Sequence, residues 1–382
     1  MSVVAFLVAV FLVRAALGAF FQAPGASGPL LVPAFGMDWT QFGTLVGLFW
    51  LPGLVLAFPL GLAARRLGDR TGVLLGLGLL VAGGLVSAAG TLLLLHAGRL
   101  LMGTGTVLVI LLLTKMMQDR FQGADLFPAM SVYVVGWPIG IAAAQAMLPG
   151  LALSAGWQAP FLVASAAGVA ALLALAAASR PAARASAPMP AGGRLSRREF
   201  GLMCLAGACW AAINGTYMVL VTFAPLLLVE RGLGVAEAGH AASLMSWVNL
   251  LAVPLGAVLA RRARMVWPMV AVCIPLAAAL AVALTLAGTA WSAAILAAHG
   301  VLYALPITVF AALPAMAVPP ERRAQGLGVY FVWFYAGCTG FPPLAGRLAD
   351  ATGGAAAPVL LAAGLLVVAL ALFLAFRRVV RR

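Results

Sequence analysis

The chain has 382 residues, of which 64% are hydrophobic and 8% are charged, and its mean hydropathy is +1.11. Soluble domains carry about a quarter charged residues, so this composition excludes a soluble protein and indicates one that is integral to a membrane. The formal net charge of +14 does not indicate nucleic-acid binding, because the basic residues are spread among the connections between apolar segments.

Apolar segments follow one another along the whole chain. A transmembrane helix needs roughly 20 apolar residues, and we predict about twelve, at residues 3–33, 40–64, 71–90, 92–117, 126–149, 157–178, 200–229, 237–260, 266–288, 291–317, 325–349 and 355–376. Nearly all basic residues fall in alternate connections, whereas the opposite connections hold only Arg231 and Arg347. This positive-inside pattern predicts a multi-pass protein with both termini in the cytoplasm. Lysine occurs only at Lys115, and such arginine-rich usage favours a GC-rich bacterium and its inner (cytoplasmic) membrane.

One connection is much longer than the others and divides the chain. Residues 179–198 are rich in Pro, Ala, Gly and Arg and cannot bury an apolar face, so we predict a flexible cytoplasmic linker. The linker separates an N-terminal six-helix bundle, residues 1–178, from a C-terminal six-helix bundle, residues 199–382.

The two halves share short sequence signals at matching places. The first half reads GPLL at Gly28–Leu31 and PLG at Pro59–Gly61. The second half reads APLL at Ala224–Leu227 and PLG at Pro254–Gly256. Because their order and spacing agree, they indicate two parallel six-helix repeats. In transporters built from such repeats the substrate binds near the bilayer midplane, between the halves.

Three motifs resemble those of the major facilitator superfamily. The segment Gly61–Arg70 (GLAARRLGDR) is similar to the family's loop signature between spans two and three. Arg99–Gly105 (RLLMGTG) resembles its R-x-x-x-G-x-G motif, and Gly136–Gly140 (GWPIG) resembles the hinge motif of span five, where Gly136 permits close packing and Pro138 a kink. The resemblance implies an all-α fold of two six-helix repeats that transports solutes by alternating access.

The loop motif departs from the family pattern at two places. Arg65 stands where the family usually has an acid, and Asp69 stands where it usually has a base. In the family that acid latches the two halves through nearby helix ends. Here we expect an inverted pair, Arg65 or Arg66 with Asp119 at the end of span four, to do similar work.

Longer segments resemble one branch of the family, the cyanate-permease-like facilitators. They are Leu45–Arg66, Leu113–Phe121, Gly136–Ile141 and Asn214–Gly239. The resemblance implies uptake or efflux of a small anionic or nitrogenous solute.

Only two charged residues, Arg14 and Arg99, fall deep inside apolar segments. A charge near the bilayer centre costs at least ~2.5–3.5 kcal/mol on insertion scales, and no Asp or Glu is placed to neutralise either. At 1.5 Å per residue, both lie roughly 16–20 Å from the cytoplasmic face, so the two guanidiniums are suited to clamp one planar anion. Two alternatives remain open: a structural or gating role for Arg99, whose motif occurs in carriers of other substrates, and snorkelling of Arg14 to the interface.

Further polar and aromatic residues are candidates for the same site. Trp210, Asn214 and Tyr217 recur at helical spacing and lie on one face of span seven. His299 is the one deep group that exchanges a proton near neutral pH, with a neutral imidazole bonded between helices as the alternative. We assign substrate binding to Arg14, Gln22, Arg99, Trp137, Asn214, Tyr217 and His299.

The sequence thus predicts a secondary transporter of a small anion, cyanate-like, nitrate-like or a short carboxylate. We expect a monomer in the lipid bilayer without a cofactor, a bound metal or nucleic acid. A proton-coupled multidrug or metabolite exporter of the same fold is the first alternative, but such exporters generally need buried carboxylates. An intramembrane enzyme is disfavoured because the three histidines are scattered and no HExxH motif occurs. A receptor without transport has no soluble signalling domain to support it.

Overall fold

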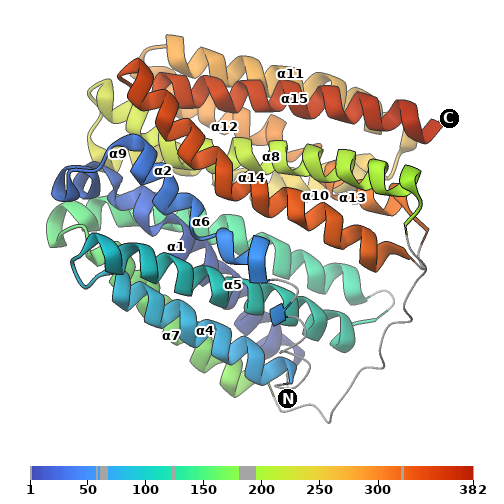
Figure 1. Cartoon of the computed structure of the whole chain (residues 1–382), viewed down its shortest axis with the longest axis horizontal. Helices are drawn as coiled ribbons and strands as arrows, with labels where there is room; N and C mark the ends of the chain where they lie inside the picture. The colour runs from blue at the N-terminus through green and yellow to red at the C-terminus, as the bar shows by residue number, and fades with distance from the viewer. Residues whose placement is uncertain are drawn as a thin grey trace.

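The computed structural model describes residues 2–56, 59–60, 68–122, 125–179, 195–319 and 322–381, and within these ranges the chain is almost entirely α-helical and has no strand. The N-terminal half lies in the lower part of Figure 1 and the C-terminal half in the upper part. The bundle has two ends. The terminal end is the one at which the first helix begins and the last helix ends. The opposite end, with the connections at residues 36–38 and 231–234, is the loop end.

Apart from three divided spans, the helices match the predicted spans to within six residues at each end. The N-terminal half contains α1 (Val3–Phe35), α2 (Trp39–Gly47), α4 (Asp69–Ser87), α5 (Leu92–Arg120), α6 (Leu126–Ala155) and α7 (Ala159–Ala178). The C-terminal half contains α8 (Arg197–Glu230), α9 (Val235–Trp247), α10 (Asn249–Ala260), α11 (Ala263–Leu286), η2 (Thr289–Trp291), α12 (Ser292–Ala304), α13 (Ile307–Ala317), α14 (Arg323–Thr352) and α15 (Ala356–Arg381).

Ten segments of the described chain are long and apolar enough to cross a membrane. The other two predicted spans correspond to α14, which has 30 residues, and to the segment that begins with α2. The predicted fold class, an all-α membrane bundle of about twelve transmembrane helices, is therefore confirmed.

Three predicted spans are interrupted in the structure. The span at 40–64 has a turn after α2, the span at 237–260 is broken at Val248, and the span at 291–317 is broken at Pro306. Pro52 and Pro254 follow the first two breaks within a few residues. Proline lacks a backbone N–H and its ring displaces the carbonyl four residues earlier, here those of Leu48 and Leu250, so it favours a kink near the first two breaks. The kinks leave backbone carbonyls without helical partners, which matters for the site.

Glycines allow the helices within each half to approach closely. In the N-terminal half, Gly140 of α6 lies against Ala15 of α1, and a Cβ at Gly18 would lie 2.6 Å from the carbonyl oxygen of Trp137. In the C-terminal half, α8 packs against both α14 and α15, with Gly207 against Trp333. Small residues let two helix backbones approach closely, and the van der Waals contact between them stabilises helix packing in a membrane.

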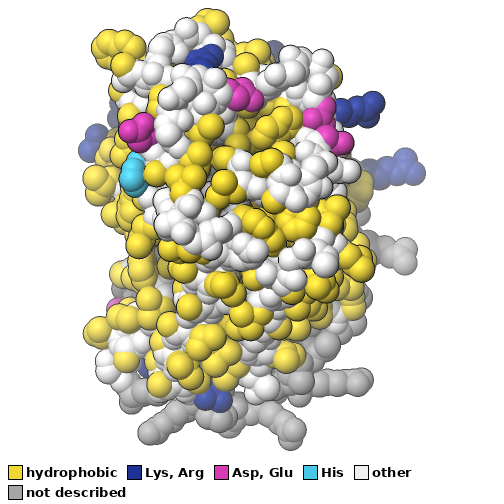
Figure 2. Space-filling model, turned by 90° about the vertical axis from the view of Figure 1, so that its left-hand side faces the viewer, with side chains coloured by type: hydrophobic (Ala, Val, Ile, Leu, Met, Phe, Trp, Pro, Cys, Tyr) yellow, Lys and Arg dark blue, Asp and Glu magenta, His cyan; other side chains and the backbone are white. Residues whose placement is uncertain are grey.

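The two halves are joined from the loop end to the middle of the molecule. At the loop end, the Asp350 carboxylate of α14 accepts hydrogen bonds from the backbone N–H groups of Trp39 (2.8 Å) and Thr40 (2.9 Å) and from Thr40 Oγ1 (2.6 Å). A carboxylate here also suits the positive N-terminal end of α2. Figure 2 shows the loop end as a closed surface, with Asp and Glu side chains mainly over its upper part.

Further contacts between α2 and α14 continue toward the middle of the bundle. Gly43 and Gly47 lie against the backbone of Pro342 and Thr339. The last ring contact in this direction joins Trp50 to Phe334 (5.4 Å between centroids) and to Tyr335. Tyr335 is twelve residues into α14, about 18 Å from its start at 1.5 Å per residue. In the part of the chain that the structure describes, the bonded and ring contacts between the halves therefore stop near mid-membrane.

Candidate functional site

Arg14 lies at about the same depth in the bundle as the last described contacts between the halves. It is eleven residues into α1, about 16 Å along the helix from the terminal end. Its Nε donates a hydrogen bond to the carbonyl oxygen of Tyr133 on α6 (3.0 Å). Its guanidinium carbon lies 4.4 Å from the centre of the Tyr133 ring and 5.5 Å from that of Trp137. Both rings present a negative face to the cation.

The terminal nitrogens of Arg14 are open. Among the described residues, no acceptor lies within hydrogen-bond distance of Nη1 or Nη2, and the side chain is partly exposed. The crossing of α1 and α6 fixes this position, because a Cβ at Gly136 would lie 2.6 Å from the Cβ of Arg14. The predicted hinge glycine therefore also seats the arginine against α6.

No carboxylate among the described residues compensates Arg14. Each described Asp and Glu lies within a few residues of a helix end: Asp38, Asp69, Asp119, Asp125, Glu199, Glu230, Glu237 and Asp350. The ion pairs found in these ranges involve Lys115 and Arg322. Arg14 is thus a partly buried cation that is held by the Tyr133 carbonyl and by the rings of Tyr133 and Trp137.

An aromatic cluster extends from Arg14 across the interface between the halves. Trp137 lies 5.7 Å from Trp50 and 5.8 Å from Phe21, and Trp50 in turn contacts Phe334 of the opposite half. The Trp50 Nε1–H is buried and has no acceptor in the described chain. A buried donor without a partner is costly, so this indole N–H adds a second unpaired donor to the region around Arg14.

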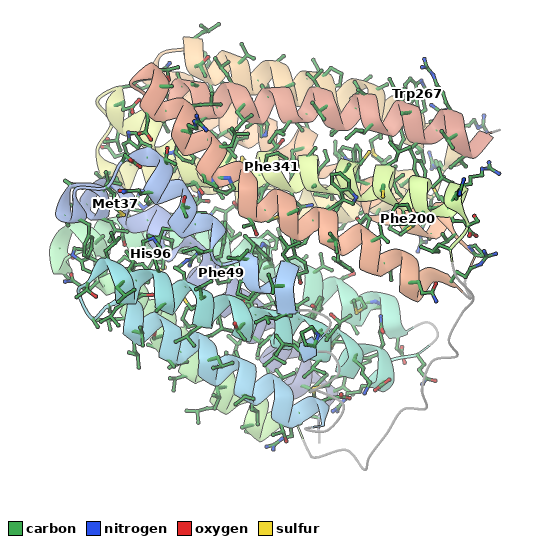
Figure 3. All side chains as sticks on the ribbon, in the orientation of Figure 1. Met37, Phe49, His96, Phe200, Trp267 and Phe341 are labelled. Atoms are coloured by element: carbon green, nitrogen blue, oxygen red, sulfur yellow. The ribbon has the colours of Figure 1, made fainter. Side chains whose placement is uncertain are left out.

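Arg99 has a different environment from Arg14. Its side chain is 0% exposed and donates to three backbone carbonyls: Nη1 to Phe20 (2.8 Å), Nε to Leu45 (3.2 Å) and Nη2 to Val46 (3.4 Å). The Phe49 ring lies 4.7 Å from its guanidinium carbon, and Figure 3 labels this ring in the middle of the N-terminal half.

The carbonyls that Arg99 binds are those that helix irregularities leave free. Pro24 has no N–H to donate to Phe20, four residues earlier in α1. Since α2 ends at Gly47 and a turn follows, the carbonyls of Leu45 and Val46 also lack helical partners. Phe20 lies six residues beyond Arg14, about 120° around α1. The structure therefore gives the two arginines separate partners and does not place them as one clamp.

Comparison with known proteins identifies the family. The sequence model of the Major Facilitator Superfamily matches residues 6–342 and 205–382. The chain belongs to this superfamily. It is a transporter rather than an enzyme, and its two halves provide alternating access.

Two solved structures show the same fold. They are a bacterial homologue of the human lysosomal transporter Spinster in an inward-facing, unoccupied conformation and in an inward-facing, occupied one. The first has a TM-score of 0.75 at 19% identity, covering 98% of this chain and 96% of that one. The second has a TM-score of 0.71 at 18% identity, covering 97% and 96%. No curated protein matches the sequence.

A buried polar network joins the two halves of this facilitator deeper in the bundle than Arg14, from which Gln22 is separated by eight residues of α1. Gln22 of α1 and Gln145 of α6 each donate from Nε2 to the carbonyl oxygen of Val221 in α8, at 3.1 and 3.2 Å. Pro225 lacks the N–H that would otherwise bond this carbonyl. Two amides of the N-terminal half thus replace one missing helical bond of the C-terminal half. We call these residues, Gln22, Gln145, Val221 and Pro225, the glutamine latch.

The network continues into the C-terminal half through hydroxyl groups. Ser246 Oγ donates to Gln145 Oε1 (3.2 Å) and lies 2.9 Å from the hydroxyl of Tyr217. The Tyr217 ring stacks on Tyr303. Gln22 and Tyr217, predicted to bind substrate, are therefore found in one buried network, whereas Gln145 and Ser246 were missed. Gln145 is an amide in an apolar segment, as Gln22 is, and that signal could have found it.

We expect Gln145→Leu to destabilise the described conformation by about 1–3 kcal/mol, because it leaves the Val221 carbonyl with one donor and Ser246 without its acceptor. Amide hydrogen exchange across the middle of α8 should accelerate. Gln122→Leu is the control, since Gln122 is exposed outside the latch. Equal exchange of α8 in both variants and the wild type would show that the latch adds no stability.

The remaining predicted binding residues, Asn214 and His299, form their described hydrogen bonds within the C-terminal half. Asn214 donates from Nδ2 to the carbonyl oxygen of Trp210, one turn earlier in its own helix (2.8 Å). His299 is buried between helices, its Nδ1 lies 2.9 Å from the carbonyl oxygen of Ala277, and its ring stacks on Tyr303. This Nδ1 donates, since a carbonyl only accepts, and the structure describes no partner for Nε2. This is the geometry of an imidazole bonded between helices, which the sequence analysis gave as the alternative role of His299.

The loop motif is described only in part. Asp69 forms an ion pair with Lys115 of α5 (2.6 Å), and Asp119 lies 3.9 Å from the same ammonium. Lys115, which sequence reasoning did not single out, thus ties the start of α4 to the end of α5. Gly61, Arg65 and Arg66 lie outside the described residues, so their predicted gating role stays a prediction.

Proposed function

We propose that this facilitator transports a small planar anion, of the cyanate, nitrate or short-carboxylate type, and that Arg14 binds it. The supporting observation is the pair of open terminal nitrogens on a partly buried guanidinium, next to the aromatic cluster that reaches the other half through Trp50. A guanidinium presents two parallel N–H donors that match the two oxygens of a carboxylate. The resemblance of several segments to cyanate-permease-like facilitators agrees with this substrate class.

The aromatic surroundings favour a flat substrate. The guanidinium carbon lies over the rings of Tyr133 and Trp137 and only Nε is bonded, which leaves Nη1 and Nη2 free. Trp50 offers a further N–H when the halves separate. In this proposal Trp137 orients Arg14, the glutamine latch stabilises the described conformation, and Arg99 supports the fold instead of contacting substrate.

We further propose that both termini lie in the cytoplasm of a bacterial inner membrane and that residues 1–178 and 199–382 move as the two units of a monomer. The loop end would then face outward, and Arg14 would be reached from the cytoplasmic side in the described conformation. The exporter alternative is less favoured, because no described carboxylate lies deep within a helix.

A thermal-shift screen of the purified protein tests the proposal. Cyanate, nitrate, nitrite, short carboxylates and a lipophilic organic cation would be compared with sodium chloride at equal ionic strength. At least one planar anion should raise the melting temperature, and the shift should vanish in Arg14→Gln. Stabilisation by an organic cation alone, unchanged in Arg14→Gln, would instead support the exporter.

A further inference from the structure

A crevice opens at the terminal end of the C-terminal half. Its volume is about 540 Å³, and α8, α14 and α15 form its walls. Its lining is mostly apolar: Gly201, Leu202, Cys204, Leu205, Ala208, Trp333, Leu372 and Val379, with Arg197 and Arg198 at one end. Figure 3 places the neighbouring Phe200 at this end of the molecule.

The crevice faces away from the other half and therefore toward lipid. Gly201 lies nine residues from Trp210, about two and a half turns, so the two occupy opposite sides of α8. Trp210 packs on Phe334, which contacts Trp50 of the N-terminal half. Trp333 and Pro342 are likewise nine residues apart on α14, and Pro342 contacts the N-terminal half. The Trp333 side chain is 42% exposed although it lies in an apolar segment. These positions separate the crevice from the site at Arg14.

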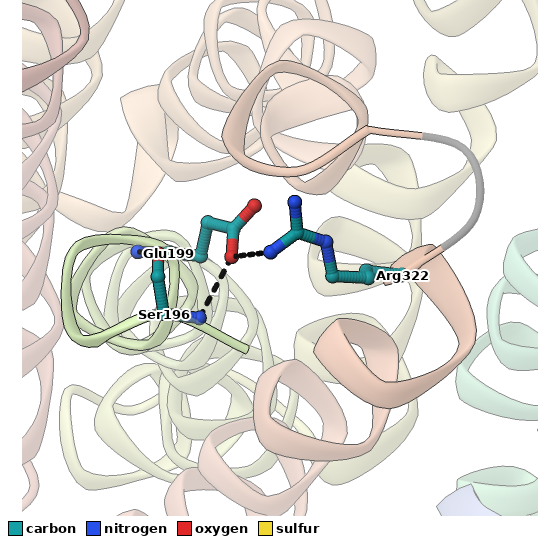
Figure 4. A network of polar contacts seen from close by, with 3 residues as sticks. All are labelled: Ser196, Glu199 and Arg322. Carbon is teal, nitrogen blue, oxygen red and sulfur yellow. Dashed lines mark hydrogen bonds and ion pairs between the residues drawn. The ribbon is translucent and has the colours of Figure 1, made fainter. Parts of the chain in front are cut away.

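The charge at the mouth of the crevice is positive, and no acid in the described ranges forms an ion pair with Arg197 or Arg198. Arg197 and Arg198 are both exposed, and Arg198 Nη2 donates to the carbonyl oxygen of Val379 (3.0 Å). The nearest acid in sequence, Glu199, is already engaged: its Oε2 accepts from the N–H of Ser196 (2.8 Å) and from Arg322 Nη1 (2.7 Å). Figure 4 shows this three-residue network.

We propose that the crevice binds an anionic phospholipid, with one acyl chain along the apolar walls and the phosphate at Arg197 and Arg198. Basic pockets between transmembrane helices at a membrane surface are suited to anionic headgroups. The guanidinium fork pairs with phosphate oxygens, and an apolar crevice within the bilayer is filled by a lipid chain. An anion lacking an acyl chain would gain nothing from the apolar walls, so the occupant is a lipid.

The test compares lipid stabilisation of purified variants. Phosphatidylglycerol and phosphatidylcholine would be added separately to detergent-solubilised protein, and melting temperatures measured. We expect phosphatidylglycerol to raise the melting temperature of the wild type by several degrees more than phosphatidylcholine does. The double variant Arg197→Gln/Arg198→Gln should lose this difference, whereas the control Arg261→Gln/Arg262→Gln, an exposed basic pair outside the crevice, should keep it.

A second variant tests the apolar part of the site. A Cβ at Gly201 would have no neighbour within 4 Å, so Gly201→Leu fills the crevice without a clash. It should fold normally and lose the phosphatidylglycerol stabilisation although both arginines remain. An equal lipid effect in the wild type, the Arg197/Arg198 variant and Gly201→Leu would overturn the proposal, as would the same loss in the Arg261/Arg262 control.

Discussion

Arg14→Gln should abolish transport while leaving the protein folded. Each charge-assisted hydrogen bond from the guanidinium is worth about 1.5–3 kcal/mol, and 1.4 kcal/mol corresponds to a tenfold change in affinity. Losing two such bonds predicts at least a hundredfold weaker binding of the anion. In proteoliposomes, uptake or exchange at low substrate concentration should fall to background, whereas the melting temperature stays within a few degrees of the wild type.

Arg14→Lys separates charge from geometry. The lysine keeps a cation near the rings of Tyr133 and Trp137 but loses the planar fork. We expect it to restore part of the transport, with a higher apparent Michaelis constant than the wild type. Transport by Arg14→Gln at the wild-type rate would remove Arg14 from the binding site.

Arg99→Met should affect stability far more than Arg14→Gln. The substitution leaves the carbonyls of Phe20, Leu45 and Val46 buried without donors, at about 1–3 kcal/mol for each group. Part of this loss is offset because the buried charge is removed as well. We expect a net loss of about 3 kcal/mol or more, seen as poor yield of folded protein and a strongly lowered melting temperature.

Arg70→Gln is the matched control for Arg99. Arg70 also binds backbone carbonyls, those of Ser179 and Ala176 at the end of α7, but it is only partly buried. Water can replace its hydrogen bonds, so its loss should cost little. Similar melting temperatures for Arg99→Met and Arg70→Gln would show that Arg99 does not support the fold through these carbonyls.

The sequence was sufficient for the architecture because length and polarity determine it. An apolar segment of about 20 residues forms a helix wherever a bilayer leaves its backbone no other partner. The ends of the apolar stretches therefore predicted most helix limits to within a few residues. Breaks such as the one at Val248 were not predicted. A proline such as Pro254 bends some helices and interrupts others, and its packing, which the sequence does not show, decides between the two.

The candidate site was predicted only in part, for a physical reason. Depth along a helix follows from residue counting, so Arg14 and Arg99 were found, but depth does not show which way a side chain points. Arg99 turns to carbonyls that Pro24 and the end of α2 leave free. Gln22 and Gln145 converge on Val221 from different helices. Such convergence depends on the crossing of helices distant in sequence, which spacing within one helix does not reveal.

The most direct test of anion binding by Arg14 is a structure of the protein with the stabilising anion bound. We predict the anion between the two halves, within hydrogen-bond distance of Nη1 and Nη2 of Arg14, with Arg99 still on its three carbonyls. An anion bound elsewhere, with Arg14 unchanged against Tyr133 and no contact to its terminal nitrogens, would contradict the central claim.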